Sequence, residues 1–152
     1  MKTAIVHDWL VSRGGGEKAL ESLLGLYPSP VYTLVHSPAA MRGTPIEAAQ
    51  VRTSFIQRLP LAATQYRNYL PLFALAAEQF DLSEHELVIS VSHAVAKGVL
   101  TRHDQLHLCY CLTPMRYAWD LYFDYMRTLG PLRRAAAALV LSRLRQWDVA
   151  SS

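Results

Sequence analysis

The sequence predicts a three-layer α/β domain built around a mainly parallel sheet. Of the 152 residues, 51% are hydrophobic and only 18% are charged, so the chain can bury a sizeable core. Apolar runs such as Thr3–His7 and Leu87–Val91 are continuous rather than alternating, which is typical of parallel strands covered on both faces. Segments with helical spacing separate these runs, and that alternation favours right-handed crossovers around one sheet.

The first half of the chain contains three predicted strands. The first is Thr3–His7, and a loop ending in three glycines (8–16) follows it. Apolar residues at helical spacing then predict a helix over Ala19–Tyr27, which two prolines end. The second strand covers Val31–Val35, and the third covers Ala48–Thr53 after a loop that contains two prolines.

The middle of the chain predicts helical turns followed by a buried strand. Phe55–Arg67 mixes helical turns with a proline, and Tyr69–Phe80 reads as one apolar helix. Pro71 falls near the first turn of that helix, where proline is tolerated. The strand Leu87–Val91 follows, and Ser92–Gly98 is a turn or a short helix.

The last third predicts one more strand and two helices. The strand is Gln105–Cys111, and a helical segment follows over Pro114–Met126. Cys109 and Cys111 are two residues apart in the strand, so they face the same side and cannot bridge without distortion. We expect reduced, buried thiols, and two thiols alone make no zinc site. The final helix is expected to bury Leu132, Ala136, Leu139, Val140, Leu144 and Trp147.

Positive charge is concentrated in one segment. The formal net charge is +3, and residues 116–145 hold six arginines and two aspartates, so the rest of the chain is close to neutral. Such a stretch fits phosphate, an anionic lipid surface or simply a solvated helix face. No apolar run approaches the length of a membrane span, and Asp8 interrupts the N-terminal apolar stretch, which argues against a signal peptide. A cytoplasmic protein is therefore expected.

The loop with Gly14 and Gly16 is the first candidate site, because ligands of open α/β sheets bind beyond the carboxyl ends of the strands. Its G-x-G-x-x-A pattern matches a dinucleotide fingerprint only loosely. Six residues separate it from the strand, and no acid ends the second strand. Ala19 after Lys18 excludes a Walker pattern. Two interpretations stay open, an anion at a helix N-terminus and a tight turn that begins a helix.

The second candidate is Ser90–Gly98, which gathers two hydroxyls, an imidazole and an ammonium just beyond a predicted strand. His93 can hydrogen-bond sugar hydroxyls or move a proton near neutral pH. Lys97 can meet a phosphate. The alternative is that the histidine is structural.

The third candidate combines Arg116, Tyr117, Trp119 and Asp120 within five residues. Aromatic rings stack on sugar faces, arginine binds phosphate or carboxylate, and aspartate holds hydroxyls. On a helix, Arg116 and Asp120 are four residues apart, so they could instead pair with each other.

At these motifs the chain resembles the family-four glycosyltransferases, and within them the subgroup of mannosyltransferases that assemble surface polysaccharides. The similarity runs along nearly all 152 residues, and the combined motifs are highly specific. The segments that carry it are Ala4–Leu10, Gly14–Glu17, Ser92–Gly98 and Cys109–Asp120, with Arg52–Pro60 and Gln146–Asp148.

The resemblance implies a GT-B fold, in which two Rossmann-like domains enclose the active site. Residues 1–152 would be the N-terminal, acceptor-side domain, and the C-terminal donor domain would be absent from this chain. Such enzymes usually retain anomeric configuration and need no metal or other cofactor. The implied reaction transfers a hexosyl unit, mannosyl in the named subgroup, from a nucleotide diphosphate sugar to a glycan or lipid-linked acceptor. A peripheral position at the inner face of the membrane and no nucleic-acid partner are expected.

The resemblance also implies roles for individual residues. His93 is the expected catalytic residue, and Gly15, Gly16 and Glu17 would approach the donor from the acceptor side. The expected acceptor contacts are His7, Asp8, Lys97, Arg116, Tyr117, Trp119 and Asp120. Leu112 stands where the subgroup commonly has a histidine, so either His93 supplies that contact or this chain is catalytically impaired.

Two further hypotheses remain. The chain could be a non-catalytic, truncated remnant or a module that binds acceptor or a partner, which Leu112 and the missing donor domain both favour. A nicotinamide-dependent oxidoreductase rests only on the loose glycine pattern.

Overall fold

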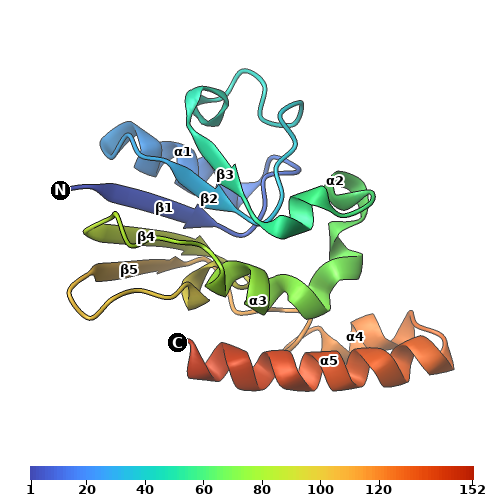
Figure 1. Cartoon of the computed structure of the whole chain (residues 1–152). Helices are drawn as coiled ribbons and strands as arrows, with labels where there is room; N and C mark the ends of the chain where they lie inside the picture. Colours follow the sequence, from blue (N-terminus) through green and yellow to red (C-terminus); the bar gives the residue numbers. More distant parts are fainter.

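Five strands form one parallel sheet in the order β3-β2-β1-β4-β5. The computed structural model describes all 152 residues, and the strands are β1 (Thr3–His7), β2 (Val31–Thr33), β3 (Val51–Thr53), β4 (Leu87–Ser92) and β5 (Leu106–Cys111). The chain moves outward from β1 to β3 and then returns to the other side of β1 for β4 and β5 (Figure 1). The strand order therefore reverses between β1 and β4, which is where ligands of such sheets commonly bind.

Helix α1 (Gly15–Leu26) covers one face of the sheet. Leu20 and Leu24, four residues apart on one side of the helix, are buried against Ile5 of β1 and Ile89 of β4. Fully burying such a side chain stabilises the fold by about 1.5–3 kcal/mol. The apolar spacing that predicted this helix is thus also what fixes it to the sheet.

The opposite face is covered by α3 (Phe73–Glu78) and α5 (Pro131–Ala150). Phe73 and Ala76 pack in one cluster with Val6 and Val88, and Leu141 of α5 extends the same cluster. Figure 1 shows α3 against the sheet and α5 as an outer rod along the edge of the domain. The short helices α2 (Ala62–Gln65) and α4 (Tyr122–Arg127) complete this side. The predicted three-layer, Rossmann-like α/β class with a parallel sheet is confirmed.

Two predicted elements are shorter than expected because proline changes their geometry. The predicted strand 48–53 begins only at Val51, since Pro45–Ala48 forms a 3₁₀ turn with proline at its start. The predicted helix 69–80 is a 3₁₀ segment over Tyr66–Leu72 that leads into α3. Pro71 lies inside that 3₁₀ segment, where its missing N–H prevents a regular α-helical ladder.

The predicted helix 114–126 is also mostly irregular. Residues 116–121 form turns, and only Tyr122–Arg127 is α-helical. The Ala118 carbonyl accepts a hydrogen bond from the Arg145 side chain at 3.1 Å instead of a helical N–H. Tertiary contacts with α5 therefore replace part of the expected helix.

The burial predicted for the last helix is wrong in part. Of the six residues expected to be buried, only Leu144 is buried. Leu132, Ala136 and Leu139 are exposed, and Val140 and Trp147 are half-buried. The other buried residues of α5 are Leu141 and Asp148. The inward face is thus a narrower stripe than the sequence suggested, and it includes a carboxylate. No helix in the structure combines the length and apolarity that a membrane span requires.

The cysteines are free, as predicted, but they are exposed rather than buried. β5 is the edge strand of the sheet, and all of its residues except the half-buried His107 are exposed. Leu106, Leu108 and Tyr110 on its other face are each about half exposed, at 54%, 49% and 56%. The continuous run of apolar residues predicted the strand correctly, but it also predicted that both faces of the strand are buried, and they are mostly exposed.

Candidate functional site

A buried carboxylate organises the point where the strand order reverses. Asp8, directly after β1, has no exposed surface. Its Oδ2 accepts hydrogen bonds from the backbone amides of His93 (2.7 Å) and Ala94 (3.0 Å), and its Oδ1 accepts from Val95 (2.6 Å) and Ala96 (2.8 Å). Four consecutive amides of the loop after β4 therefore converge on one side chain, whose charge strengthens each bond. The placement of Asp8 favours a positioning role over the direct acceptor contact that the sequence suggested.

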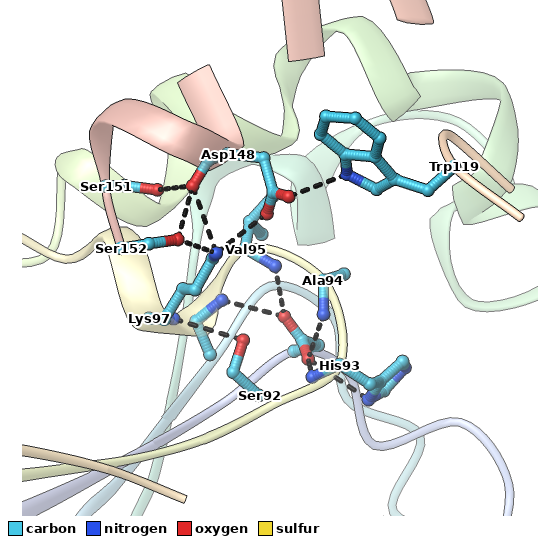
Figure 2. Close-up of polar contacts among 11 residues, drawn as sticks. Ser92, His93, Ala94, Val95, Lys97, Trp119, Asp148, Ser151 and Ser152 are labelled. Carbon is cyan, nitrogen blue, oxygen red and sulfur yellow. Dashed lines mark hydrogen bonds and ion pairs between the residues drawn. The ribbon is translucent and has the colours of Figure 1, made fainter. Parts of the chain in front are cut away.

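His93 lies on this loop with its ring held between two groups. Its Nδ1 is 3.1 Å from Asp8 Oδ2, and its ring meets the Trp9 ring edge-on, with centroids 4.5 Å apart. The side chain is 28% exposed. The predicted catalytic residue is thus ordered by the loop after β1 and still accessible to solvent. Figure 2 shows the ring at one end of the contact network.

The glycine loop lies beside His7 and Leu112. The N-terminus of α1 begins after Gly14, whose amide donates to Glu17 Oε2 at 2.8 Å. A Cβ on Gly16 would come within 3.0 Å of Leu112 Cδ1 and 3.1 Å of His7 Cε1, so glycine permits this close approach. Leu112 therefore faces the glycine loop directly.

His7 and Glu17 form a buried pair under this loop. His7 Nδ1–H donates to the Val91 carbonyl at 3.0 Å, and its Nε2 lies 3.6 Å from Glu17 Oε1 without a hydrogen bond. Burial raises the pKa of Glu17, but His7 and the amides of Glu17 and Gly14 outweigh it, so the pKa is lower than usual. Glu17 places a negative charge at the N-terminus of α1. This carboxylate repels an anion that approaches the same helix N-terminus.

A cavity of about 370 Å³ opens where the loops after β1, β4 and β5 meet. Its lining is mostly apolar and aromatic, with two guanidinium groups and one imidazole. Trp9 and His93 come from the first two loops, and Arg116 and Tyr117 come from the third. Arg67, from the 3₁₀ segment before α3, adds a second positive charge. Three predicted site residues, His93, Arg116 and Tyr117, are thus brought together in one cavity.

Tyr117 and Arg116 differ in how accessible their polar groups are to a ligand. The Tyr117 hydroxyl is buried without a hydrogen-bond partner. Burial raises its pKa strongly, and the negative charge of Asp8 raises it further, so it remains a neutral phenol. Arg116 pairs with Asp120 at 3.4 Å, as the alternative interpretation predicted, but both side chains are more than half exposed. Such a pair is weak, so Arg116 is available to a ligand.

Lys97 and Trp119 contact Asp148 rather than the cavity. Lys97 Nζ lies 2.9 Å from Asp148 Oδ1 and donates to the Asp148 carbonyl at 3.0 Å, while Trp119 Nε1 donates to Oδ2 at 2.8 Å. Figure 2 shows this clamp beside the loop that carries His93. The Lys97 charge is therefore balanced within the fold. Trp119, Asp120, Arg116 and Asp148 line a second, more open depression of about 530 Å³ next to the cavity.

Sequence reasoning missed several residues of the site. Arg67 and Phe73 lie outside every motif and reach the cavity through the fold, Arg67 from the 3₁₀ segment and Phe73 from the start of α3. Trp9 lay inside a motif, and its large aromatic side chain beside a strand end was the available signal. Asp148 lay inside the segment Gln146–Asp148, but its contacts with Lys97 and Trp119 carried no signal, because those partners are distant in the sequence.

Comparisons with models of protein families, with curated proteins and with solved structures found no match.

Proposed function

We propose that this chain is the acceptor-side domain of a retaining family-four glycosyltransferase. In this proposal it transfers a hexosyl unit, mannosyl by resemblance, from a nucleotide diphosphate sugar to a glycan or lipid-linked acceptor. A second, donor-binding domain completes the site. The single observation that carries the proposal is the cavity at the reversal of strand order, which unites His93 with Arg116 and Tyr117.

The lining of the cavity suits an acceptor with an apolar part and an anionic part. Trp9, Leu70 and Tyr125 offer apolar and aromatic surface, while Arg67 and Arg116 supply positive charge. Arg67 lies over the Tyr66 ring at 5.4 Å and has no carboxylate partner. A sugar attached through phosphate to a lipid matches both properties, since rings contact the lipid or the sugar and guanidinium groups bind phosphate.

His93 is positioned to act on the acceptor. An imidazole on a rigid loop can accept the proton of a sugar hydroxyl or hold that hydroxyl in place. Gly15 offers the donor an open backbone, because nothing lies within 4 Å of a Cβ there, whereas Leu112 and His7 already occupy that side of Gly16. In this arrangement the two substrates meet between the glycine loop and His93, whose ring centroid lies 6.0 Å from that of His7.

Isothermal titration with nucleotide sugars tests the proposal. The 152-residue chain and a longer form, extended through any coding sequence that follows, are titrated with GDP-mannose, UDP-glucose and UDP-N-acetylglucosamine. We expect only the longer form to bind a donor, and the donor that binds identifies the sugar class. Tight binding of a nucleotide sugar by the 152-residue chain would contradict the split of donor and acceptor sites.

Leu112 favours a second candidate function, a binding module that transfers nothing. Its side chain occupies the position beside Gly16 and His7 where the subgroup's histidine would face the donor. Leucine can neither donate nor accept a hydrogen bond there.

The Leu112→His substitution in the longer form distinguishes the two functions. If the chain belongs to an enzyme that this residue weakens, the restored hydrogen bond should raise kcat about 5- to 150-fold, since such bonds contribute about 1–3 kcal/mol. Leu112→Ala is the control and should not raise kcat. If neither wild type nor Leu112→His releases nucleotide diphosphate in the presence of acceptor, the binding module is the better account.

We also propose a peripheral contact between α5 and an anionic membrane. Leu132, Leu139 and Arg143 follow one another at helical spacing on the outward side of α5, and Phe123 of α4 is 73% exposed. Two of the arginines in this basic segment turn inward instead. Arg134 donates to the carbonyls of Met126 and Leu129, and Arg145 lies over the Tyr122 ring. The contact therefore rests on Arg127, Arg133 and Arg143 with the apolar stripe.

Vesicle sedimentation at low salt tests the membrane contact. Each basic residue near an anionic surface contributes about 1 kcal/mol, so Arg133→Glu with Arg143→Glu should weaken binding to phosphatidylglycerol vesicles about tenfold or more. Lys18→Glu with Arg42→Glu is the charge-matched control, because both residues are exposed and their elements, α1 and the loop between β2 and β3, lie on the other side of the domain from α5 (Figure 1). Equal losses in both variants, or no binding by wild type, would contradict the contact.

A further inference from the structure

The contact between the Asp8 carboxylate and the His93 ring is not required to hold the backbone of the loop. Two oxygens of Asp8 already accept four backbone amides, which accounts for the burial of a charged side chain at the start of this loop. The His93 ring could point elsewhere without disturbing any of these bonds. It instead turns back so that Nδ1 lies 3.1 Å from Oδ2.

The surroundings hold the ring in this orientation. The edge-on contact with Trp9, at an interplanar angle of 88°, limits rotation of the imidazole away from Asp8. Trp9 is itself packed against Tyr66 and Phe73, with ring centroids 5.1 Å and 5.7 Å away. The ring is therefore supported by a rigid aromatic cluster on one side and a fixed carboxylate on the other.

This geometry distinguishes the two ring nitrogens. A lone pair on Nδ1 would face a carboxylate oxygen that carries negative charge, whereas a proton on Nδ1 is attracted to it. The Nε2 atom has no hydrogen-bond partner within the chain. In a neutral histidine, which tautomer is present follows from the partner of the opposite nitrogen. A free histidine side chain in water favours the Nε2–H tautomer, so the contact with Asp8 opposes the intrinsic preference.

We propose that Asp8 is a positioning residue that holds the His93 proton on Nδ1 and leaves Nε2 as the unprotonated ring nitrogen available to the cavity. An unprotonated Nε2 is a hydrogen-bond acceptor and a base, which is the form needed to receive the proton of a hydroxyl group. What Nε2 does to an acceptor rests on the proposed glycosyl transfer. The tautomer itself does not, because it is set within the chain.

Nitrogen NMR of the histidine rings tests the proposal on the 152-residue chain without any sugar nucleotide. Two-bond proton–nitrogen spectra of the ¹⁵N-labelled protein, recorded at mildly alkaline pH, separate protonated from unprotonated ring nitrogens. The signal that disappears in His93→Gln belongs to His93. We expect a protonated Nδ1 and an unprotonated Nε2. The opposite pattern overturns the proposal, whatever the chain transfers.

Two variants separate positioning from loop structure. In Asp8→Asn, the side-chain amide no longer presents a charged oxygen, so the His93 signals should shift toward the Nε2–H pattern. Ser92→Ala is the matched control, because it removes the hydrogen bond from the Lys97 amide to Ser92 Oγ in the same loop and keeps Asp8. Its tautomer should equal that of wild type. An unchanged tautomer in folded Asp8→Asn overturns the role of Asp8, and the wild-type spectrum decides the proposal if that variant does not fold.

Discussion

At the scale of single residues, Asp8 shows how one buried charge can be stable. An isolated carboxylate away from water is very costly, and hydrogen bonds to its ionised form offset that cost. Asp8 obtains four of them from consecutive amides, each between 2.6 and 3.0 Å. The loop gains equally, because those amides would otherwise be buried without acceptors.

Replacing Asp8 with alanine should therefore destabilise the whole domain. We expect the free energy of unfolding to fall by about 3–5 kcal/mol, because the loop amides lose their only acceptors. Urea denaturation followed by tryptophan fluorescence measures the change. Asp124→Ala is the control. Its side chain is 68% exposed and pairs with Arg127 on the surface, so its loss should stay below about 1 kcal/mol. Similar losses in the two variants would refute this account of Asp8.

Residue types and motif positions pointed to three residues that line the cavity, but not to the partners of each polar side chain. His93, Arg116 and Tyr117 meet in the cavity because parallel strands bring their carboxyl-end loops to one edge. Asp8 and Lys97 were expected to face a ligand, but their charges are balanced within the fold. Whether a polar side chain can contact a ligand depends on whether another residue of the fold already binds it. Asp148 binds Lys97 from 51 positions away, and the spacing of residues within a motif does not predict such a contact.

At the scale of elements, α5 is attached to the domain by polar and aromatic contacts as much as by apolar burial. Trp147 lies against the backbone of Gly98 and donates from Nε1 to Glu78 at 2.6 Å. Asp148 holds Lys97 and Trp119 one residue further along. The last turns of α5 therefore pack onto the loop that carries His93.

Gly98→Ala should loosen this packing. A Cβ at position 98 would overlap the Cζ2 and Cη2 atoms of Trp147, so the indole must move. Overpacking of this kind costs about 1–3 kcal/mol. We expect a lower melting temperature and a red shift of tryptophan fluorescence as Trp147 becomes exposed.

The matched control is Gly25→Ala, near the end of α1. Nothing lies within 4 Å of a Cβ there, and alanine is the better helix former, so this variant should gain up to about 1 kcal/mol. If Gly98→Ala is as stable as wild type and its fluorescence is unchanged, the packing of Trp147 on Gly98 contributes little to the attachment of α5.

The elements predicted best were those whose residue pattern lies entirely within the element itself. Continuous apolar runs identified β1 and β4, and helical spacing identified α1. The 3₁₀ segment around Pro71 was misread as an α-helix because proline near a helix start and proline inside a 3₁₀ turn look alike in the sequence. Cover over a strand is not local either. Cys109 and Cys111 are exposed because the helices leave most of β5 uncovered.

At the scale of the whole molecule, three histidines link stability to pH. Burial lowers the pKa of His36 and of His107. Burial, followed by the positive charge of Arg52, lowers the pKa of His85. They are distributed over the domain, since His36 follows β2, His85 precedes β4 and His107 lies in β5. Buried ring nitrogens of His36 and His85 have no hydrogen-bond partner that would compensate for a charge.

We therefore expect the domain to lose stability as the pH falls below about 6.5, the value at which histidines titrate in an unfolded chain. The unfolded state then binds protons that the folded state excludes, so the free energy of unfolding decreases until the lowered pKa values of the folded state are reached. Above about 6.5 the contribution of the three histidines to stability is fully present.

The urea midpoint should be lower at mildly acidic pH than at neutral pH. His36→Gln combined with His107→Gln should flatten this dependence, because glutamine stays neutral, whereas His103→Gln in an exposed loop should leave it unchanged. A midpoint that rises on acidification would show that protonation stabilises the fold and that another group dominates the linkage.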